Sequence, residues 1–373
     1  MTSREAYIAL NMMDRLGPVR VRSLAEALGS VEAIFDAPAG ELMRAQGVGP
    51  ELARRIVEQR GEIQPDKELA RARKMGLSIV TPVDLEYPEW LKTIYDPPLA
   101  LYVKGTIEAK DRHAVAIVGT RRPTHYGSTV ADRLAYQLAR VGFTVVSGLA
   151  RGVDTVAHKG ALKANGRTLA VLGSAHDCLY PPENAELAEA IAKSGAVISE
   201  YPLGREPDRT TFPYRNRVVS GLSMGVVVVE AGLGSGALHT TDQAIEQGRT
   251  VFAVPGRIDV PSARGCHRLL KNGARLVEDV DDILQELEYL IPPEKKDSAQ
   301  AMDPRPRVEL TTDEQAVVKA VWAGAMDVDA VTRQAGLQAA QVNSLLIGLE
   351  MKRVVRMLPG RRIELAEGIR AAG

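Results

Sequence analysis

Glycine and arginine residues that directly follow short apolar runs are the residues of this chain best suited to chemistry. Gly119, Thr120 and Arg121 follow the run AVAIV. Glycine lets the backbone approach an anion, threonine adds a hydroxyl and an amide, and the arginine guanidinium is a two-pronged donor. The segment therefore predicts a phosphate contact. A tight strand-to-helix turn with a solvated arginine is the structural alternative.

A second segment repeats this composition at the end of the next apolar run. The run FTVVS continues into GLARG, and its candidate phosphate-binding residues are Ser147, Gly148, Arg151 and Gly152. Just downstream, Asp154 and His158 are four residues apart, which places them on one face of a helix. Because no third ligand lies nearby in sequence, a local hydrogen bond is favoured over a metal site.

Aromatic and arginine residues are interleaved in the segment FPYRNR. Its candidate residues are Phe212, Arg215, Asn216 and Arg217, and Arg205 and Arg209 precede it. Bases stack on flat rings while arginines neutralise the backbone, and one stacked base contributes about 1–3 kcal/mol. Aromatic residues make up only 4% of the chain, so their clustering favours single-stranded nucleic acid. In the alternative, the rings pack in the core and the arginines pair with acids such as Glu206 and Asp208.

A glycine-rich loop follows the most apolar run, VVVV. Its candidate residues are Ser235, Gly236, Thr240 and Thr241, and such a loop is typical of a phosphate nest. Glu230 and Asp242 are available as general acid and base for a nucleotide-cleaving enzyme, but the sequence identifies no nucleophile. This enzyme is the alternative to a binding function.

Several classes of site lose their sequence support. The chain has no G-x-x-x-x-G-K-[ST] motif and no G-x-G-x-x-G after AVAIV, so neither NAD nor any other cofactor is predicted. Cys178 and Cys266 form no C-x-x-C pair, which argues against structural zinc and disulfides and favours a reducing compartment. Lys+Arg and Asp+Glu both number 47, so an anion site requires a local concentration of charge. No apolar stretch approaches a membrane span, and a cytoplasmic location is expected.

Six apolar runs must position the candidate residues. They are AVAIV, TVVS, LAVL, AVIS, VVVV and VFAV. Continuous runs of this length predict strands buried on both faces, with crossover helices between them. Open sheets of this kind bind ligands outside the carboxyl ends of the strands, where Arg121, Arg122, Arg151 and Arg257 stand. The fold class is therefore α/β with a mostly parallel sheet.

Composition divides the chain into four parts. Residues 1–66 show helical spacing, residues 67–290 form the α/β domain, and residues 291–307 are charged and proline-rich, as in an extended linker. Residues 308–373 predict three helices and a hairpin, which make a winged helix-turn-helix. A capping box, Thr311-x-x-Glu314, precedes the first of these helices.

The flanking modules each leave two interpretations open. The turn from Gly47 to Pro50 matches a helix-hairpin-helix motif, with Arg54 and Arg55 within about a turn of a phosphate held by backbone amides. The alternative is a turn that only lets two helices pack closely. In the winged module, the third helix is poor in basic residues before Lys352 and Arg353, so protein docking and duplex reading are both open.

With these motifs in order, the chain resembles the DNA-processing protein A (DprA/Smf) family nearly end to end. The resemblance is carried by GTR, SGLARGVDTVAH, TLAVLG, YPPEN, ISEYP, FPYRNRVVSGLS, VVVVEAGLGSGALHTT and VFAVPG. It implies an extended Rossmann-like domain that binds single-stranded DNA without catalysis. It also implies a homodimer that helps to place the recombinase RecA on incoming strands during natural transformation.

Within this resemblance, Arg121 falls on the family's DNA-contacting arginine, and Thr120 stands where serine is more usual. A basic residue commonly follows the family's Tyr-Pro pair, whereas this chain has Tyr180-Pro181-Pro182. The departure removes one expected phosphate contact, for which Arg205, Arg209 or Arg215 are possible replacements.

Overall fold

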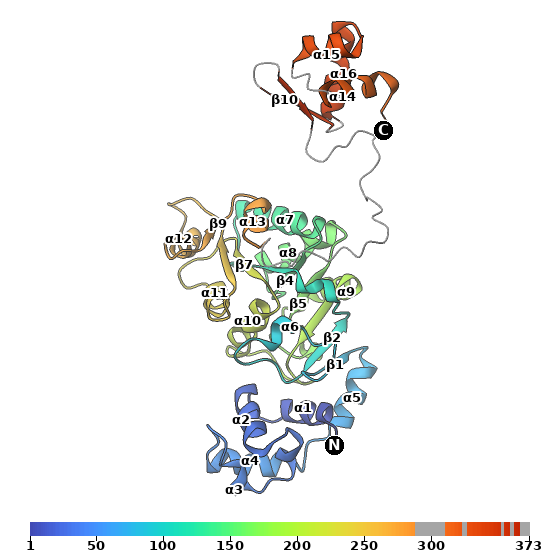
Figure 1. Cartoon of the computed structure of the whole chain (residues 1–373). Coiled ribbons are helices and arrows are strands. Elements are labelled where there is room, and N and C mark those ends of the chain that lie inside the picture. Colours follow the sequence, from blue (N-terminus) through green and yellow to red (C-terminus); the bar gives the residue numbers. More distant parts are fainter. Residues whose placement is uncertain (288–309, 323–326, 352–353, 359–361, 366–373) are drawn as a thin grey trace. The chain divides into compact units, whose positions relative to one another are not determined.

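The computed structural model describes residues 1–287, 310–322, 327–351, 354–358 and 362–365. The chain separates into two compact units, Met1–Pro293 and Glu294–Gly373. The first contains a helical module and a nine-stranded sheet, and the second contains three helices and a hairpin (Figure 1). The predicted linker, residues 291–307, lies outside the described residues.

The amino-terminal residues form a small helical module. Its helices are α1 (Ser3–Asn11), α2 (Pro18–Leu28), η1 (Glu32–Phe35), α3 (Ala39–Leu42), α4 (Pro50–Gln59) and α5 (Pro65–Lys74). Pro18, Pro50 and Pro65 open their helices, where a missing N–H costs nothing. Leu10, Leu24, Leu42 and Ile56 meet in one buried core. The helical character predicted for residues 1–66 is confirmed, but α5 continues past the predicted boundary at residue 66, and its Ala72 packs with Leu77 and Ile79.

The α/β domain is built on a nine-stranded sheet of order β1-β2-β6-β5-β4-β3-β7-β8-β9. The strands are β1 (Ser78–Val80), β2 (Leu101–Gly105), β3 (Ala114–Val118), β4 (Thr144–Ser147), β5 (Thr168–Val171), β6 (Ala196–Ser199), β7 (Gly225–Val228), β8 (Thr250–Ala253) and β9 (Arg275–Leu276). The six apolar runs are the parallel strands β3 to β8, as predicted. The pairing of β1 with β2 and of β2 with β6 is antiparallel and was not predicted.

Strand β3 shows why these runs are continuous rather than alternating. Val115 and Ile117 pack into the core beneath one layer of helices, while Ala114, Ala116 and Val118 pack into the core on the opposite face. Both faces are buried, so every position is apolar.

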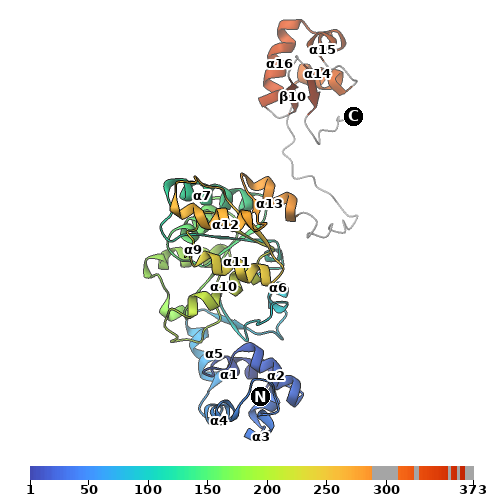
Figure 2. The same cartoon turned by 90° about the vertical axis from the view of Figure 1, so that its left-hand side faces the viewer.

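Two layers of helices cover the sheet. One face carries α7 (His125–Arg140), α8 (Val153–Lys163), α9 (Ala185–Ser194) and α13 (Val280–Leu287). The other carries α6 (Glu89–Lys92), α10 (Thr211–Gly221), α11 (Ala237–Glu246) and α12 (Arg264–Lys271). Figure 2 shows α10, α11 and α12 together on the face turned to the viewer.

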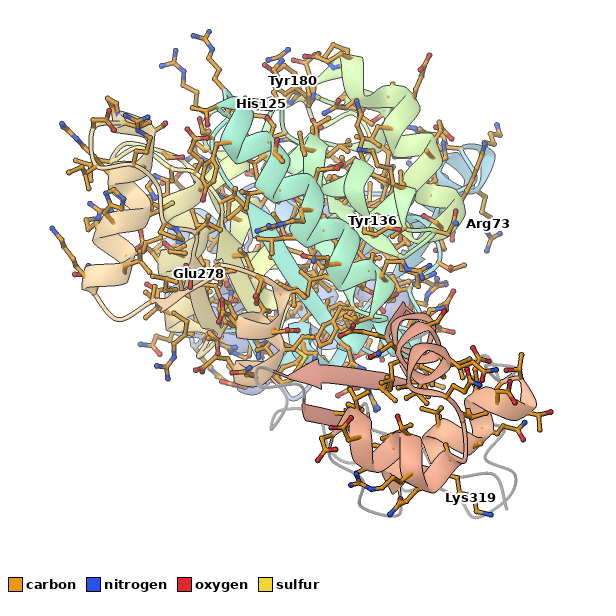
Figure 3. The ribbon with its side chains drawn as sticks, turned by 90° about the horizontal axis from the view of Figure 1, so that it is seen from above. Arg73, His125, Tyr136, Tyr180, Glu278 and Lys319 are labelled. Carbon is orange, nitrogen blue, oxygen red and sulfur yellow. The ribbon has the colours of Figure 1, made fainter. Side chains whose placement is uncertain are left out.

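The order of the strands creates a topological switch point at the centre of the sheet. From β3 the chain adds β4, β5 and β6 on one side and then returns to place β7 and β8 on the other side of β3. Loops at a switch point diverge and leave a crevice at the carboxyl ends of the strands. Figure 3 shows His125, which begins α7 after β3, and Tyr180 at the same end of this domain.

The second unit has the elements of a winged helix-turn-helix. They are α14 (Thr312–Trp322), α15 (Val328–Ala335), α16 (Ala339–Met351) and the antiparallel pair β10 (Val355–Leu358) and β11 (Arg362–Leu365). The capping box is present, because the Thr311 amide donates to Glu314 Oε2 at 2.8 Å and the Glu314 amide donates to Thr311 Oγ1 at 3.3 Å. Val331, Val342 and Leu346 pack into its core.

No helix within the described ranges is both long enough and apolar enough to cross a membrane.

Candidate nucleic-acid interface

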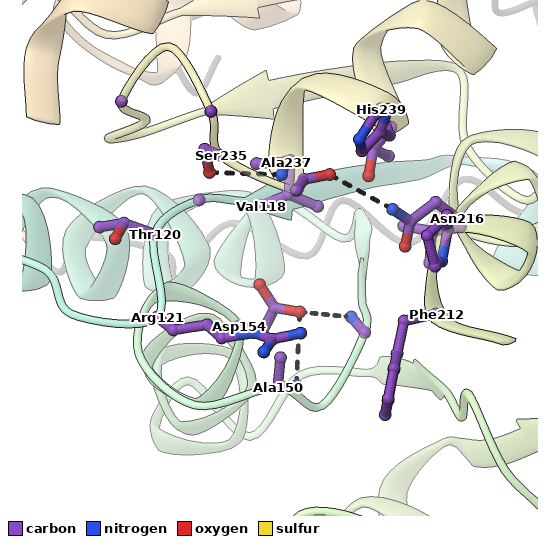
Figure 4. Close-up of a pocket in the computed structure, with 18 of the residues that line it drawn as sticks. Val118, Thr120, Arg121, Ala150, Asp154, Phe212, Asn216, Ser235, Ala237 and His239 are labelled. Atoms are coloured by element: carbon purple, nitrogen blue, oxygen red, sulfur yellow. Dashed lines mark hydrogen bonds between the residues drawn. The ribbon is translucent and has the colours of Figure 1, made fainter. Parts of the chain in front are cut away.

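A pocket of about 1110 Å³ opens at the carboxyl ends of the central strands (Figure 4). The loops after β3, β4 and β7, the start of α10 and the turn before α12 form its walls. The predicted residues that line it are Gly119, Thr120, Arg121, Gly148, Phe212, Arg215, Asn216, Ser235, Gly236 and Thr240. Four segments that are far apart in sequence therefore meet at one site, as the strand order requires.

Arg121 combines charge with exposure. Its side chain is exposed, and its guanidinium carbon lies 5.7 Å from the centre of the Phe212 ring. Arg121 forms no ion pair with any residue that the structure describes. Figure 4 shows Arg121 and Phe212 in the wall of the pocket. A cation beside an aromatic face is suited to a phosphate and its adjoining base.

Thr120 holds its loop in place through the backbone. Its amide donates to the Glu230 carbonyl at 2.6 Å, and its hydroxyl accepts a hydrogen bond from the Arg122 amide at 3.2 Å. The prediction that the Thr120 amide binds phosphate is therefore wrong, because that N–H already has an acceptor. The hydroxyl proton of Thr120 is left as a donor to a ligand.

Arg215 is a buried part of the pocket wall. Only 4% of it is exposed, and Nη1 donates to the carbonyls of Gly148, at 2.7 Å, and Val171. Beside it, the Asp154 carboxylate accepts from the Gly148 amide at 3.1 Å. Burial raises the pKa of Asp154 to about 6, although the positive charge of Arg215 opposes the shift. Arg215 thus supports the loop after β4 rather than standing free in the crevice.

Arg217 does not reach the pocket. It is 2% exposed, donates to Glu200 Oε2 at 2.6 Å and lies 2.9 Å from Asp96 Oδ2. The prediction of a DNA contact for Arg217 is wrong, because α10 turns this side chain away from the face that carries Phe212 and Asn216. The alternative of pairing with acids holds for Arg217, with different partners from those named.

Three more predicted residues have structural roles outside the pocket lining. The Ser147 hydroxyl is buried and donates to Ile117 O at 2.7 Å, and the Thr241 hydroxyl is buried and donates to Leu238 O at 2.7 Å. Gly152 adopts φ +79°, and a Cβ there would lie 2.4 Å from Thr120 O. Direct phosphate contacts by the Ser147 and Thr241 hydroxyls are wrong, because both hydroxyls are buried and already donate. Close packing explains why residue 152 is a glycine, and a phosphate contact by its backbone stays a prediction.

Arg151 is half-exposed but already neutralised. It forms a two-pronged ion pair with Glu183, and its Nη1 donates to the Tyr180 hydroxyl at 3.0 Å. Arg257 is paired similarly with Asp259 at 2.8 Å, and neither arginine lines the large pocket. A phosphate would have to compete with these carboxylates.

The two acids of the enzymatic alternative are not placed as a pair. Glu230 is 5% exposed, and its Oε2 accepts from the amide and hydroxyl of Thr124 at 2.9 and 3.1 Å. The Ser262 hydroxyl donates to its other oxygen. Asp242 is exposed on α11 and is absent from the pocket lining. Glu230 therefore connects the loops of Thr124 and Ser262 by hydrogen bonds. Glu230 and Asp242 do not form the acid–base pair that a nucleotide-cleaving enzyme would need.

Asp154 and His158 each have a separate partner. His158 Nδ1 lies 2.7 Å from Thr168 Oγ1, and burial lowers the pKa of His158 to about 3. In the described ranges, no group of three or more His, Cys, Asp or Glu is placed to hold a metal ion.

Two arginines of the pocket were missing from the predicted site. Arg209 precedes α10, and the sequence offers it only as a replacement contact, while Arg264 begins α12. Both line the pocket, and neither has an ion-pair partner among the residues described. Arg264 is not part of any recognisable sequence motif. It lines the pocket because the chain between β8 and α12 folds back to the carboxyl ends of the strands.

The helix-hairpin-helix turn has the geometry that its sequence predicts. Gly47 adopts φ +78°, and Gly49 caps α4 without a side-chain acceptor. Arg54 and Arg55 lie 3.7 Å from Glu58 and 3.9 Å from Glu51, contacts typical of weak surface pairs. Its DNA-contacting role stays a prediction.

Three family models of known proteins match successive parts of this chain. Residues 78–288 match the family model of DNA recombination-mediator protein A. Residues 301–361 match the DprA winged helix domain, and residues 8–62 match a SAM-like helix-hairpin-helix tandem.

Curated relatives are similar over most of the chain. Protein Smf of Synechocystis sp. is 39% identical over 290 residues, which cover 76% of this chain and 73% of that protein. The putative DNA processing protein DprA of Mycobacterium tuberculosis is 35% identical over 359 residues, 92% of this chain and 89% of that protein.

Two solved structures are also similar. DprA from Streptococcus pneumoniae has a TM-score of 0.67 and 34% identity, covering 77% of this chain and 98% of that chain. DNA processing protein A from Helicobacter pylori has a TM-score of 0.51 and 31% identity, covering 57% of this chain and 96% of that chain. Since the family model matches more than half of the chain and the two relatives cover 76% and 92% of it, the chain belongs to the DNA recombination-mediator protein A (DprA/Smf) family.

Proposed function

We propose that this protein binds single-stranded DNA in the pocket at the carboxyl ends of β3, β4 and β7, without catalysing a reaction on it. The observation that carries the proposal is the exposed Arg121 guanidinium beside the Phe212 ring. The arginine would hold a phosphate, and the ring would stack on a base. The solved structure of the similar DNA processing protein A from Helicobacter pylori concerns the single-stranded DNA binding mode of that protein.

The charges of the pocket support an anionic ligand although the whole chain is neutral. Lys+Arg and Asp+Glu are equal at 47 each. Within the pocket, Arg121, Arg209 and Arg264 have no ion-pair partner among the described residues. Asp208 is paired with Arg205, and Asp154 lies beside the positive charge of Arg215. The local excess is positive, which favours a polyanion.

The biological role follows as a further part of the proposal. As a family member, the protein would act as a homodimer in the cytoplasm, protect incoming single strands and help to load RecA on them during natural transformation. The winged-helix and helical modules would extend contacts with DNA or with protein partners.

The test is fluorescence anisotropy with labelled oligo-dT and with a matching duplex, over a salt series and without nucleotide or metal. We expect salt-dependent preference for the single strand. Arg121→Ala should bind more weakly and lower the salt slope by about 0.7, the contribution of one phosphate on a single strand. Equal binding of both DNA forms, or an unchanged slope in the variant, would contradict the proposal.

A further inference from the structure

The pocket has a further exposed cation besides Arg121 and Arg209. Arg264 is the first residue of α12, lines the same pocket and is exposed. It has no ion-pair partner in the part of the chain that the structure describes. An arginine that is directed to a pocket and unneutralised is available for a ligand phosphate.

Backbone hydrogen bonds attach the loops of Arg121 and Arg264 to one short segment, Glu230 and Ala231. The carbonyl of Glu230 accepts from the Thr120 amide at 2.6 Å, next to Arg121. The carbonyl of Ala231 accepts from the Gly265 amide at 2.8 Å, next to Arg264. The two arginine-bearing loops are therefore both attached to the start of the glycine-rich loop through consecutive carbonyls.

The Glu230 side chain fixes the same two loops. It accepts hydrogen bonds from Thr124, which follows Arg121, and from Ser262, which precedes Arg264. Because the Ser262 hydroxyl donates its proton to Glu230, Ser262 holds the turn that precedes Arg264. Glu230 thus joins the two loops that carry Arg121 and Arg264.

The volume of the pocket lies just above the range of sites for single drug-sized ligands. Its volume is about 1110 Å³, whereas sites for single drug-sized ligands occupy roughly 300–1,000 Å³. Asn216 and the Gly234–Gly236 loop lie in the same lining as the two arginines. The space suits a stretch of strand with more than one phosphate.

We propose that Arg264 binds a second phosphate of the same DNA strand whose first phosphate is held at Arg121. The inference rests on the proposed single-strand binding. It adds a residue that has no motif in the sequence, and it makes the pocket a two-phosphate site.

The test uses the full-length protein, labelled oligo-dT and a salt series. Arg264→Ala should bind about tenfold more weakly, and its salt slope should fall by about 0.7. The double variant with Arg121→Ala should lose about 1.4 from the slope. Arg264→Lys should keep the slope, since it keeps the charge. Arg140→Ala is the matched control, because Arg140 is an exposed arginine at the far end of α7.

The possible outcomes separate the two proposals. If Arg264→Ala binds like the wild type while Arg121→Ala is weakened, the second phosphate site is refuted and single-strand binding stands. If the wild type binds no single strand, both proposals fail. Unchanged thermal unfolding of Arg264→Ala is required, so that weaker binding reports the lost contact rather than a lost fold.

Discussion

Arg217 and Glu200 form an ion pair at 2.6 Å inside the α/β domain, with 2% and 8% of their side chains exposed. Arg217 is next but one to Arg215 and five residues from Phe212, yet it faces the opposite side of α10 from the pocket. A buried pair of this kind is costly to break, because the remaining charge has no water around it.

Removing Arg217 should therefore damage stability rather than DNA contact. We expect Arg217→Ala to lower the free energy of unfolding by about 3–5 kcal/mol. The double variant Arg217→Ala with Glu200→Ala should lose less than the sum of the single variants, since neither charge is then left alone. Urea unfolding measures these values. Arg209→Ala, an exposed arginine of the pocket, is the control and should change stability by less than about 0.5 kcal/mol.

Gly152 should tolerate no side chain. It adopts φ +79°, and a Cβ would stand 2.4 Å from Thr120 O and 2.8 Å from the Arg121 Cα. Gly152→Ala should cost more than about 2 kcal/mol and weaken single-strand binding, because the loop of Arg121 must move.

Gly142 provides a control that separates the cost of a positive φ angle from the cost of a steric clash at Cβ. It adopts φ +95° with nothing within 4 Å of a built Cβ. Gly142→Ala should cost only about 1–2 kcal/mol and leave DNA binding unchanged. Equal losses in urea unfolding and anisotropy for both variants would contradict the packing role of Gly152.

Binding should strengthen as the pH falls through the pKa of Asp154. Burial raises that pKa to about 6, and Asp154 lines the pocket. Its carboxylate is charged at pH 7 and repels a phosphate, while at pH 5 it is mostly neutral. We expect the affinity for oligo-dT to increase about tenfold when the pH is lowered from 7 to 5, which is equivalent to about 1.4 kcal/mol.

The variant Asp154→Asn tests whether the Asp154 carboxylate causes this pH dependence of DNA binding. The measurement is made in a His239→Gln background, because His239 also lines the pocket. The Asp154→Asn protein should show no increase between pH 7 and 5. An increase equal to that of the background protein would assign the pH effect to another group.

His158 should make the fold sensitive to acid. Burial lowers its pKa from 6.5 to about 3, so the unfolded chain binds a proton that the folded chain refuses between these values. The contribution of His158 to the free energy of unfolding is fully present above pH 6.5 and is lost as the pH falls toward 3. Between pH 7 and 5 the loss is about 2 kcal/mol.

His158→Asn isolates this contribution. Asparagine can offer an N–H near the position of Nδ1, which lies 2.7 Å from Thr168 Oγ1, and it does not titrate. The difference in urea unfolding between pH 7 and 5 should be smaller by about 2 kcal/mol in the variant than in the wild type. The comparison removes the effects of His176, whose pKa burial lowers to about 4, and of Asp154, whose shift has the opposite sign. Identical pH dependence of the two proteins would show that His158 is not the acid-sensitive group.

The sequence by itself determined the parallel strands, the loops that end them and the winged module. Val115 and Ile117 belong to a run whose every position is apolar, and burial on both faces is the condition that such a run satisfies. Thr311 and Glu314 are close in sequence, so their capping box was also predictable. Gly119 to Arg121 follow a strand directly, and the rule that ligands bind at carboxyl ends places them correctly.

Only the tertiary structure decided which arginines face the pocket. Arg215 and Arg217 are two residues apart, but helical rotation and the acids at Asp96 and Glu200 give Arg217 a buried partner. Arg264 is far from Arg121 in sequence and reaches the same pocket because Ala231 and Glu230 fasten its loop. Local patterns fix strands and turns since these depend on neighbouring residues, whereas partners of charged side chains depend on contacts between distant segments.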